Sequence, residues 1–245
     1  MASVVNASVF DAPTAPPTEP SRKSLARRAG LLYLIACLPA PFVLVYVPSR
    51  VHVAGDPTET ADRMRAFAGI LRLGVAAELV SCLMMILAAF ALYRLFHDVD
   101  HRLAAATAVL MFISVPIQLL NLSSDIAALL LTGSDTYQSA FTKEQVDALA
   151  YLFFRIHGVG ILIAQVFWGL WLFPWGVAAM RSRFIPAWVG WAIIVAGTGY
   201  VMNSAVGLVI PRFAATVTPI GMAMGIGELA MINWLIFWGA REVRA

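Results

Sequence analysis

The sequence predicts an all-α protein, an integral membrane bundle of six transmembrane helices. Hydrophobic residues make up 60% of the chain and charged residues only 13%, and the mean hydropathy is +0.80. A soluble domain is close to half apolar and about a quarter charged, so this composition is typical of a membrane protein. Crossing a bilayer takes about 20 mostly apolar residues. Six stretches qualify, at residues 29–47, 66–96, 103–131, 146–180, 184–210 and 219–240.

The basic residues that flank these spans predict the orientation of the bundle. Ten lysine and arginine side chains lie on the side of the N-terminus and five on the opposite side: Arg22, Lys23, Arg27, Arg28, Arg94, Arg102, Arg181, Arg183, Arg241 and Arg244 against Arg50, Arg63, Arg65, Lys143 and Arg212. The positive-inside rule then places both termini in the cytoplasm, and we expect a multi-pass protein of the cell inner (plasma) membrane. Trp168, Trp171 and Trp175 near the cytoplasmic end of the fourth span fit an aromatic belt and core packing equally well.

The chain before the first span predicts a disordered cytoplasmic tail. It is rich in alanine, proline, serine and threonine, and it lacks the basic and apolar regions of a cleavable signal. We therefore divide the chain into a tail, residues 1–25, and a six-helix transmembrane domain, residues 26–245.

Local signals predict how the first span and the outer loops are built. Pro39 and Pro41 remove backbone donors from the first span and predict a kink. In the loops opposite the termini, Asp56 before a proline fits a helix cap, and Thr142 with Gln145 fits a capping box. Helices in these two loops can form a lid over that face.

Six charged or imidazole side chains lie inside the predicted spans and more than one turn from their ends: Arg72, Glu78, Asp125, Arg155, His157 and Glu228. A charge in the hydrocarbon costs about 2.5–3.5 kcal/mol on insertion scales, so such residues are expected to be paired or to face a polar cavity. Counted at ~1.5 Å per residue from the outer end of each span, all six lie in the outer half of the membrane, with Glu78 nearest the midplane. This placement predicts one polar pocket open toward the outer face.

Further polar residues extend the predicted pocket. Four of them, spaced by four, three and four residues, share one face of the third span: Ser114, Gln118, Asn121 and Asp125. Across from this stripe, Asn203 and the small face formed by Gly221, Gly225 and Glu228 are expected to complete the wall. Glycines there are equally suited to close helix packing, and Asn203 to a hydrogen bond between helices.

We interpret the two deep glutamates, Glu78 and Glu228, as candidate catalytic acids. Burial in an apolar wall disfavours a charged carboxylate, so one of them can be a proton donor at neutral pH. The residues assigned to substrate binding are Arg72, Asn121, Asp125, Arg155, His157 and Asn203. The alternative interpretation is structural, in which ion pairs pin helices together and no ligand binds.

Other patterns indicate no function. The run from His97 to His101 carries histidines four residues apart, but a short turn without a third anchored ligand favours a solvated loop over a metal site. The chain has no P-loop, GxSxG, HExxH or dinucleotide-binding motif. A net charge of +3 provides no clustered basic face for nucleic acid. We therefore expect no metal, no cofactor and no nucleic-acid partner.

Segments spread along the chain carry a family resemblance. The strongest are His157-Gly158 and the run from Ile161 to Pro174. Others lie at residues 30–34, 46–49, 71–74, 91–96 and 114–116. Together these segments resemble a family of bacterial membrane proteins catalogued as domain of unknown function 4386. The resemblance implies a multi-pass membrane protein and assigns no activity.

Three functions fit these observations, and whether the chain is an enzyme stays open. The first is a pocket that binds or transforms an amphiphilic small molecule, lipid-like or terpenoid, by acid chemistry of the cyclase or isomerase type. Its layout is analogous to that of small multi-pass terpene cyclases. The second is a structural or regulatory membrane protein whose ion pairs only fix the bundle. The third is a small proton-coupled transporter, although the inner halves of the spans carry almost no charge. Membrane lipid is an expected partner in each case.

Overall fold

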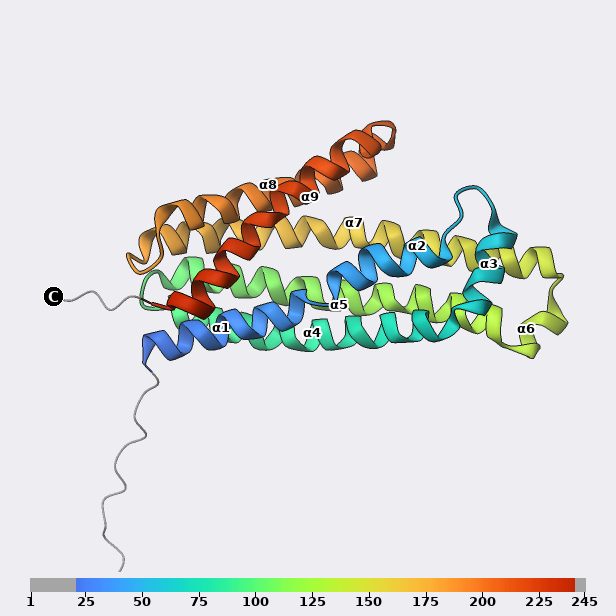
Figure 1. Cartoon of the computed structure of the whole chain (residues 1–245), viewed down its shortest axis with the longest axis horizontal. Helices are drawn as coiled ribbons and strands as arrows, with labels where there is room; N and C mark the ends of the chain where they lie inside the picture. The colour runs from blue at the N-terminus through green and yellow to red at the C-terminus, as the bar shows by residue number, and fades with distance from the viewer. Residues whose placement is uncertain (1–20, 241–245) are drawn as a thin grey trace, which may run out of the picture.

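The computed structural model describes residues 21–240, apart from the side chains of Asp135 and Gln138. Within these residues every regular element is a helix, and six candidate spans are long and apolar enough to cross a membrane (Figure 1). They are Arg22–Val51, Ala68–Phe96, His101–Gly133, Lys143–Arg181, Ala187–Val209 and Pro211–Trp238. The predicted fold class, a multi-pass bundle of six helices, is confirmed.

The two described ends of the chain lie at the same end of the bundle. Helix α1 (Arg22–Cys37) begins there and the π-helix η3 (Trp234–Trp238) ends there, whereas α3 (Pro57–Ala66) and α6 (Asp135–Ala140) lie at the opposite end (Figure 1). The end of the bundle where α1 begins and η3 ends is named the terminal end, and the opposite end of the bundle is named the α3 end. The first 20 residues of the predicted tail lie outside the described residues, as do the last two arginines of the chain, and α1 starts inside the range expected for the tail.

The first span is broken near its middle, where its prolines predict a kink. After α1 ends, the chain makes a turn and continues as the π-helix η1 (Phe42–Tyr46) and the short helix α2 (Val47–Val51). Pro39 and Pro41 cannot donate to the helical hydrogen-bond ladder, which accounts for the break. The broken segment forms part of the wall of the cavities described below.

Short helices cover the α3 end, and their caps are those that the sequence predicts. Asp56 accepts a hydrogen bond from a backbone amide in the first turn of α3, at 2.9 Å. Thr142 and Gln145 form the capping box of α7 (Lys143–Arg181). The side chain of Met64 on α3 is fully buried in an apolar cluster with the ends of the long helices. Helix α3 therefore packs over this end as a cover.

The run that contains His97 joins α4 (Ala68–Phe96) to α5 (His101–Gly133). Asp100 caps α5 by accepting backbone hydrogen bonds, of which that from Leu103 is 3.1 Å long, and it forms an ion pair with Arg181 at 2.5 Å. The backbone hydrogen bonds are the main cause that lowers the pKa of Asp100. This segment is a capped turn, in agreement with the expectation of a solvated loop.

Two apolar clusters hold the described helices together. The larger one lies toward the terminal end and includes the fully buried side chains of Tyr33 and Trp175. The smaller one, around Met64 and Val146, lies at the α3 end. Trp171 and Trp175 are buried in the larger cluster, so core packing accounts for these tryptophans rather than an aromatic belt.

Helices α8 (Ala187–Val209) and α9 (Ala214–Asn233) approach closely through small residues. A Cβ added at Gly199 would lie 2.9 Å from the backbone carbonyl of Gly221, so the helices can only approach this closely with glycine at residue 199. Toward the α3 end, α8 and α9 lean away from α7 (Figure 1). The bundle is therefore less tightly closed on that side.

The sixth span starts earlier than the sequence predicts. It begins with the 3-10 helix η2 (Pro211–Phe213), and Pro219 lies inside α9 instead of at its start. The predicted boundary was wrong because a single proline removes only one backbone donor, while packing against α8 continues on both sides of it.

Candidate functional site: two cavities that meet at Glu78

Two cavities lie inside the bundle, and Glu78 of α4 lines both. The first, about 200 Å³, is named the aromatic cavity, and its walls include Tyr33, Cys37, Trp168, Trp171, Tyr200 and Glu228. The second, about 360 Å³, is named the acidic cavity, and its walls include Pro48, His52, Asp125, Arg155 and His157. The acidic cavity lies nearer the α3 end. Because the cavities share Glu78, Val43, Leu44 and Ile161, they form neighbouring parts of one interior space.

Three ionisable side chains from three helices meet in the acidic cavity. His157 of α7 has its Nδ1 3.3 Å from Asp125 Oδ2 on α5 and its Nε2 3.6 Å from Glu78 Oε1 on α4. Asn121 donates a hydrogen bond from its Nδ2 to the backbone carbonyl of His157, at 3.0 Å. The structure thus brings together four of the residues that the sequence assigns to one pocket.

The two carboxyl groups of this cluster have unused hydrogen-bonding capacity. Glu78 Oε1 and Asp125 Oδ1 are buried and have no hydrogen-bond partner among the described residues. No lysine or arginine of residues 21–240 forms an ion pair with either carboxyl group; only His157 does. A buried polar atom without a partner costs about 1–3 kcal/mol. Ion pairs with lysine or arginine in the described part of the chain therefore do not account for the burial of these two carboxyl groups.

Gly160 makes room for the amide that supports His157. A Cβ at residue 160 would overlap the side chain of Asn121, whereas a Cβ at Gly158 would meet nothing within 4 Å. The absence of a side chain at Gly160 lets Asn121 of α5 reach across to α7. This glycine is therefore a structural requirement of the cluster.

His52 and Arg155 line the acidic cavity on the side of the α3 end. The imidazole of His52, in the loop after α2, stacks against the ring of Phe154 with centroids 5.6 Å apart. Burial, and after it the positive charge of Arg155, lowers the pKa of His52 from its ordinary value of 6.5. His52 is therefore neutral at pH 7. Arg155 has no ion pair with any acid in the described part of the chain and supplies the positive charge here.

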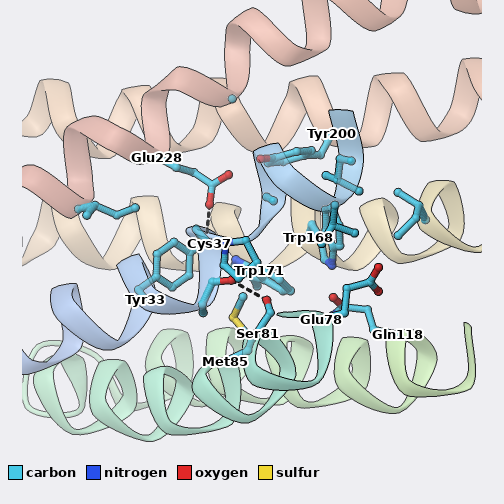
Figure 2. A pocket seen from close by; sticks show the side chains of 18 of the residues that line it. Tyr33, Cys37, Glu78, Ser81, Met85, Gln118, Trp168, Trp171, Tyr200 and Glu228 are labelled. Atoms are coloured by element: carbon cyan, nitrogen blue, oxygen red, sulfur yellow. Dashed lines mark hydrogen bonds between the residues drawn. The ribbon is translucent and has the colours of Figure 1, made fainter. Parts of the chain in front are cut away.

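Glu228 lies in the aromatic cavity and not in the acidic cluster. Its Oε2 accepts a hydrogen bond from the hydroxyl of Tyr33 on α1 (Figure 2), and Tyr200 of α8 lines the same cavity. The sequence groups Glu228 with the other charges because its depth is counted from Pro219. Since α9 starts at Ala214, Glu228 lies deeper than predicted. Glu228 therefore lines only the aromatic cavity, whereas Glu78 lines both cavities.

Three of the predicted substrate-binding residues line neither cavity: Asn121, which supports His157, and Arg72 and Asn203. Arg72 lies on the exposed face of α4. Asn203 donates to Gln165 Oε1 at 2.6 Å and accepts from Thr218 at 2.9 Å, which joins α8 to α7 and α9. The geometry of Asn203 fits the hydrogen bond between helices that the sequence leaves as its alternative role.

Aromatic residues form part of the site, and the sequence interpretation missed them. Trp168 and Trp171 line the aromatic cavity, and their indole Nε1 atoms are buried without a hydrogen-bond partner among residues 21–240 (Figure 2). Tyr33 holds Glu228 through a hydrogen bond, and Tyr200 lines the same cavity. The available signal was the presence of aromatic side chains with polar tips inside apolar spans, where such tips need partners.

Ion pairs fasten α3 to the first turn of α7. The side chain of Asp147 on α7 is 1% exposed and lies 2.5 Å from Arg65 Nη2 of α3 and 2.8 Å from Lys143 Nζ. Asp62 of α3 contacts both cations, at 2.6 Å from Arg65 Nη1 and 3.2 Å from Lys143 Nζ. The hydrogen bond from Lys143 is the main cause that lowers the pKa of Asp62. The α3 end therefore carries a cover that charged side chains hold in place.

Comparison with known proteins gives a family without an activity. An uncharacterized protein of Archaeoglobus fulgidus is 30% identical to this chain over 79 residues, which cover 32% of this chain and 46% of that protein. This chain thus spans about half the length of that relative. No solved structure matches the chain. Residues 28–239 match the model of the family described as domain of unknown function (DUF4386). With nearly all of its described residues inside that match, this multi-pass membrane protein belongs to the DUF4386 family.

Proposed function

We propose that this membrane protein binds an apolar small molecule with one polar end group, lipid-like or terpenoid, and rearranges it by acid chemistry. The observation that carries the proposal is that an aromatic cavity with a buried acid adjoins a polar cavity at Glu78. Apolar walls with a few convergent polar groups are the usual form of a small-molecule site. The apolar body of the molecule fits the aromatic cavity, and its polar end lies near His157 and Arg155.

Glu228 is the proposed proton donor. It lies on the wall of the aromatic cavity, and the hydrogen bond from Tyr33 fixes its orientation (Figure 2). Protonation of a double bond in the bound molecule would leave a positive charge in the cavity. The aromatic walls formed by Trp168 and Trp171 suit such a charge, since a cation over an indole face is stabilised by about 0.5–2 kcal/mol. A cyclase or an isomerase of apolar substrates needs this combination of an acid and aromatic walls.

The size and polarity of the acidic cavity favour this proposal over a purely structural role. Ion pairs that only pin helices would form a dry, closed cluster. Glu78, Asp125 and His157 instead line a space of about 360 Å³, and two of their oxygen atoms have no hydrogen-bond partner in the described part of the chain. These features support a ligand.

Native mass spectrometry of the protein released from mild detergent tests the proposal. We expect one defined apolar molecule with a single polar end to co-purify in stoichiometric amount. The Glu228→Gln variant should retain that molecule but no longer convert it, because the variant keeps the cavity and loses the acid. Finding only membrane phospholipids, in the proportions of the surrounding membrane, would contradict the proposal.

Proton-coupled transport is a second candidate, and one observation favours it. Asp125, His157, Glu78 and Glu228 line adjoining cavities, so titratable groups extend deeper toward the terminal end than the sequence predicts. A substrate-dependent change of internal pH in proteoliposomes would favour transport over conversion. A defined bound molecule that is converted without any pH change would favour the enzyme.

A further inference from the structure

We propose that Glu78, Asp125 and His157 bind one divalent ion of the first transition row, with Zn²⁺ and Mn²⁺ as the test ions. Only one part of this proposal rests on the proposed function: that the ion holds the polar end of the bound molecule. The sequence predicts no metal site, because these ligands come from three helices and form no spacing motif. Their convergence is visible only in the folded chain.

The geometry of the three side chains fits a single ion. One ligand atom from each lies within 4.8 Å of the others. Around a tetrahedral ion with ligands at about 2.1 Å, ligand atoms are spaced about 3.4 Å apart. The spacing of 3.3 Å between His157 Nδ1 and Asp125 Oδ2 is already of this size. Glu78 Oε1 lies 3.6 Å from the other ring nitrogen, Nε2, so a new rotamer of Glu78 or of the imidazole brings the third ligand to the same ion.

The charge of the cluster points to a cation as well. Two carboxyl groups, each only 12–13% exposed, face one imidazole, and no lysine or arginine in residues 21–240 pairs with them. Buried carboxylates are expensive unless they are paired or coordinate a metal. A divalent ion neutralises both at once. Carboxylate and imidazole ligands together suit zinc and manganese better than copper(I), which selects sulfur.

The surroundings are those of an open coordination site. Three protein ligands leave at least one position of the ion free, which is the pattern of a catalytic zinc site and not of a structural one. The ligands line the acidic cavity together with the cation of Arg155. An anionic or hydroxyl end group can therefore bridge the ion and the guanidinium. Asn121, hydrogen-bonded to the His157 carbonyl, serves as a positioning residue.

Metal analysis of the full-length protein in detergent tests the proposal. The protein is incubated with Zn²⁺ or Mn²⁺, separated from free ion, and analysed by inductively coupled plasma mass spectrometry. We expect about one ion per chain, and at least about tenfold weaker binding in Asp125→Asn and His157→Ala, since even outer-shell changes cost about 10–100-fold. Glu228→Gln is the matched control, a buried carboxyl group of the neighbouring cavity, and should bind the ion as the wild type does. A wild type that retains neither ion, or variants that bind as tightly, would overturn the proposal.

X-ray absorption of the zinc-loaded wild type decides the case if the variants do not fold. We expect a shell of nitrogen and oxygen neighbours at about 2.0–2.2 Å with the signature of one imidazole. Sulfur neighbours at about 2.3 Å would place the ion at a cysteine and overturn the proposal. The outcome is separate from that of the proposed function. A bound ion without a co-purifying molecule sustains the metal site alone, and a co-purifying molecule without an ion sustains the pocket alone.

Discussion

Glu78 and Glu228 are both glutamates on apolar helices, and they face adjoining cavities. Glu228 accepts a hydrogen bond from the hydroxyl group of Tyr33. Glu78 has only the imidazole of His157, at 3.6 Å, and its buried Oε1 has no hydrogen-bond partner in the described chain. A carboxyl group with satisfied hydrogen bonds stabilises its surroundings, whereas one without them costs stability. Burial alone therefore does not identify a functional acid; the difference in hydrogen-bond partners separates a candidate proton donor from a candidate ligand of an ion.

The largest expected effect comes from Gly160→Ala, which changes the cluster around Glu78 and leaves the surroundings of Glu228 unchanged. The new methyl group would overlap Asn121 and push its amide away from the His157 carbonyl. We expect Zn²⁺ affinity to fall by about 10–100-fold, as for other losses of an outer-shell contact. Gly158→Ala, two residues away with open space around it, is the matched control and should leave the affinity unchanged. Equal affinities for both variants would show that Asn121 does not position the cluster.

Tyr33→Phe tests how much the hydrogen bond to Glu228 contributes to stability. The change leaves a buried carboxyl group with one donor fewer, which should lower the free energy of unfolding by about 1–3 kcal/mol. The thermal midpoint in mild detergent measures this loss. Tyr93→Phe, at the terminal end of α4 in the same apolar cluster, is the control and should change the midpoint much less. An unchanged midpoint in Tyr33→Phe would mean that Glu228 does not depend on this hydroxyl.

Glu78→Gln should have a smaller effect on stability, and of the opposite sign. Replacing a buried carboxyl group without a hydrogen-bond partner by a neutral amide removes the free-energy cost of burying a charge. We therefore expect the thermal midpoint to stay the same or to rise, by an amount equivalent to at most about 1 kcal/mol in the free energy of unfolding. Bound ion should be lost in the same sample. A clear fall in the midpoint would place Glu78 with Glu228 as a stabilising residue and would remove the contrast between them.

The smallest effect concerns α3, which packs at the end of the bundle nearer the acidic cavity. The folded-state pKa of Asp62 lies below its ordinary value of 3.8, chiefly because Lys143 donates a hydrogen bond to it. The ion pairs of Asp62 therefore contribute fully above pH 3.8 and are lost as the pH falls through the lowered value. We expect a slight increase in hydrogen exchange of α3 in that window. Asp62→Asn should abolish this pH dependence, and its persistence in the variant would assign it to another group.

Most of the fold could be predicted from the sequence, because each element depends on local information. Apolar stretches mark the six spans, and Asp56 and the Thr142–Gln145 pair form the caps that their positions predict. The kink at Pro39 and Pro41 follows from missing backbone donors alone. Pro219 misled the assignment of a helix start, because packing of α9 on α8 overrides the local effect of one proline.

The site could be predicted only in part. The spacing of Asn121 and Asp125 and the rarity of charge in a span identified the acidic cluster. Its division into two cavities depends on how α9 and the two parts of the first span pack against the other helices, which no residue pattern encodes. The partnership of Glu228 with Tyr33 joins residues 195 positions apart and follows from helix packing alone.

Photolabelling of the interior tests most directly whether the two cavities form one small-molecule site. A diazirine-bearing long-chain fatty acid is photolysed with the protein in detergent, and the labelled residues are mapped by mass spectrometry. We predict labels on α7 near Ile161 and Trp168 and on α9 near Ile232, and we expect excess unlabelled fatty acid to remove them. Labels confined to exposed lipid-facing side chains such as Leu83 and Phe90, and unaffected by competitor, would contradict the account.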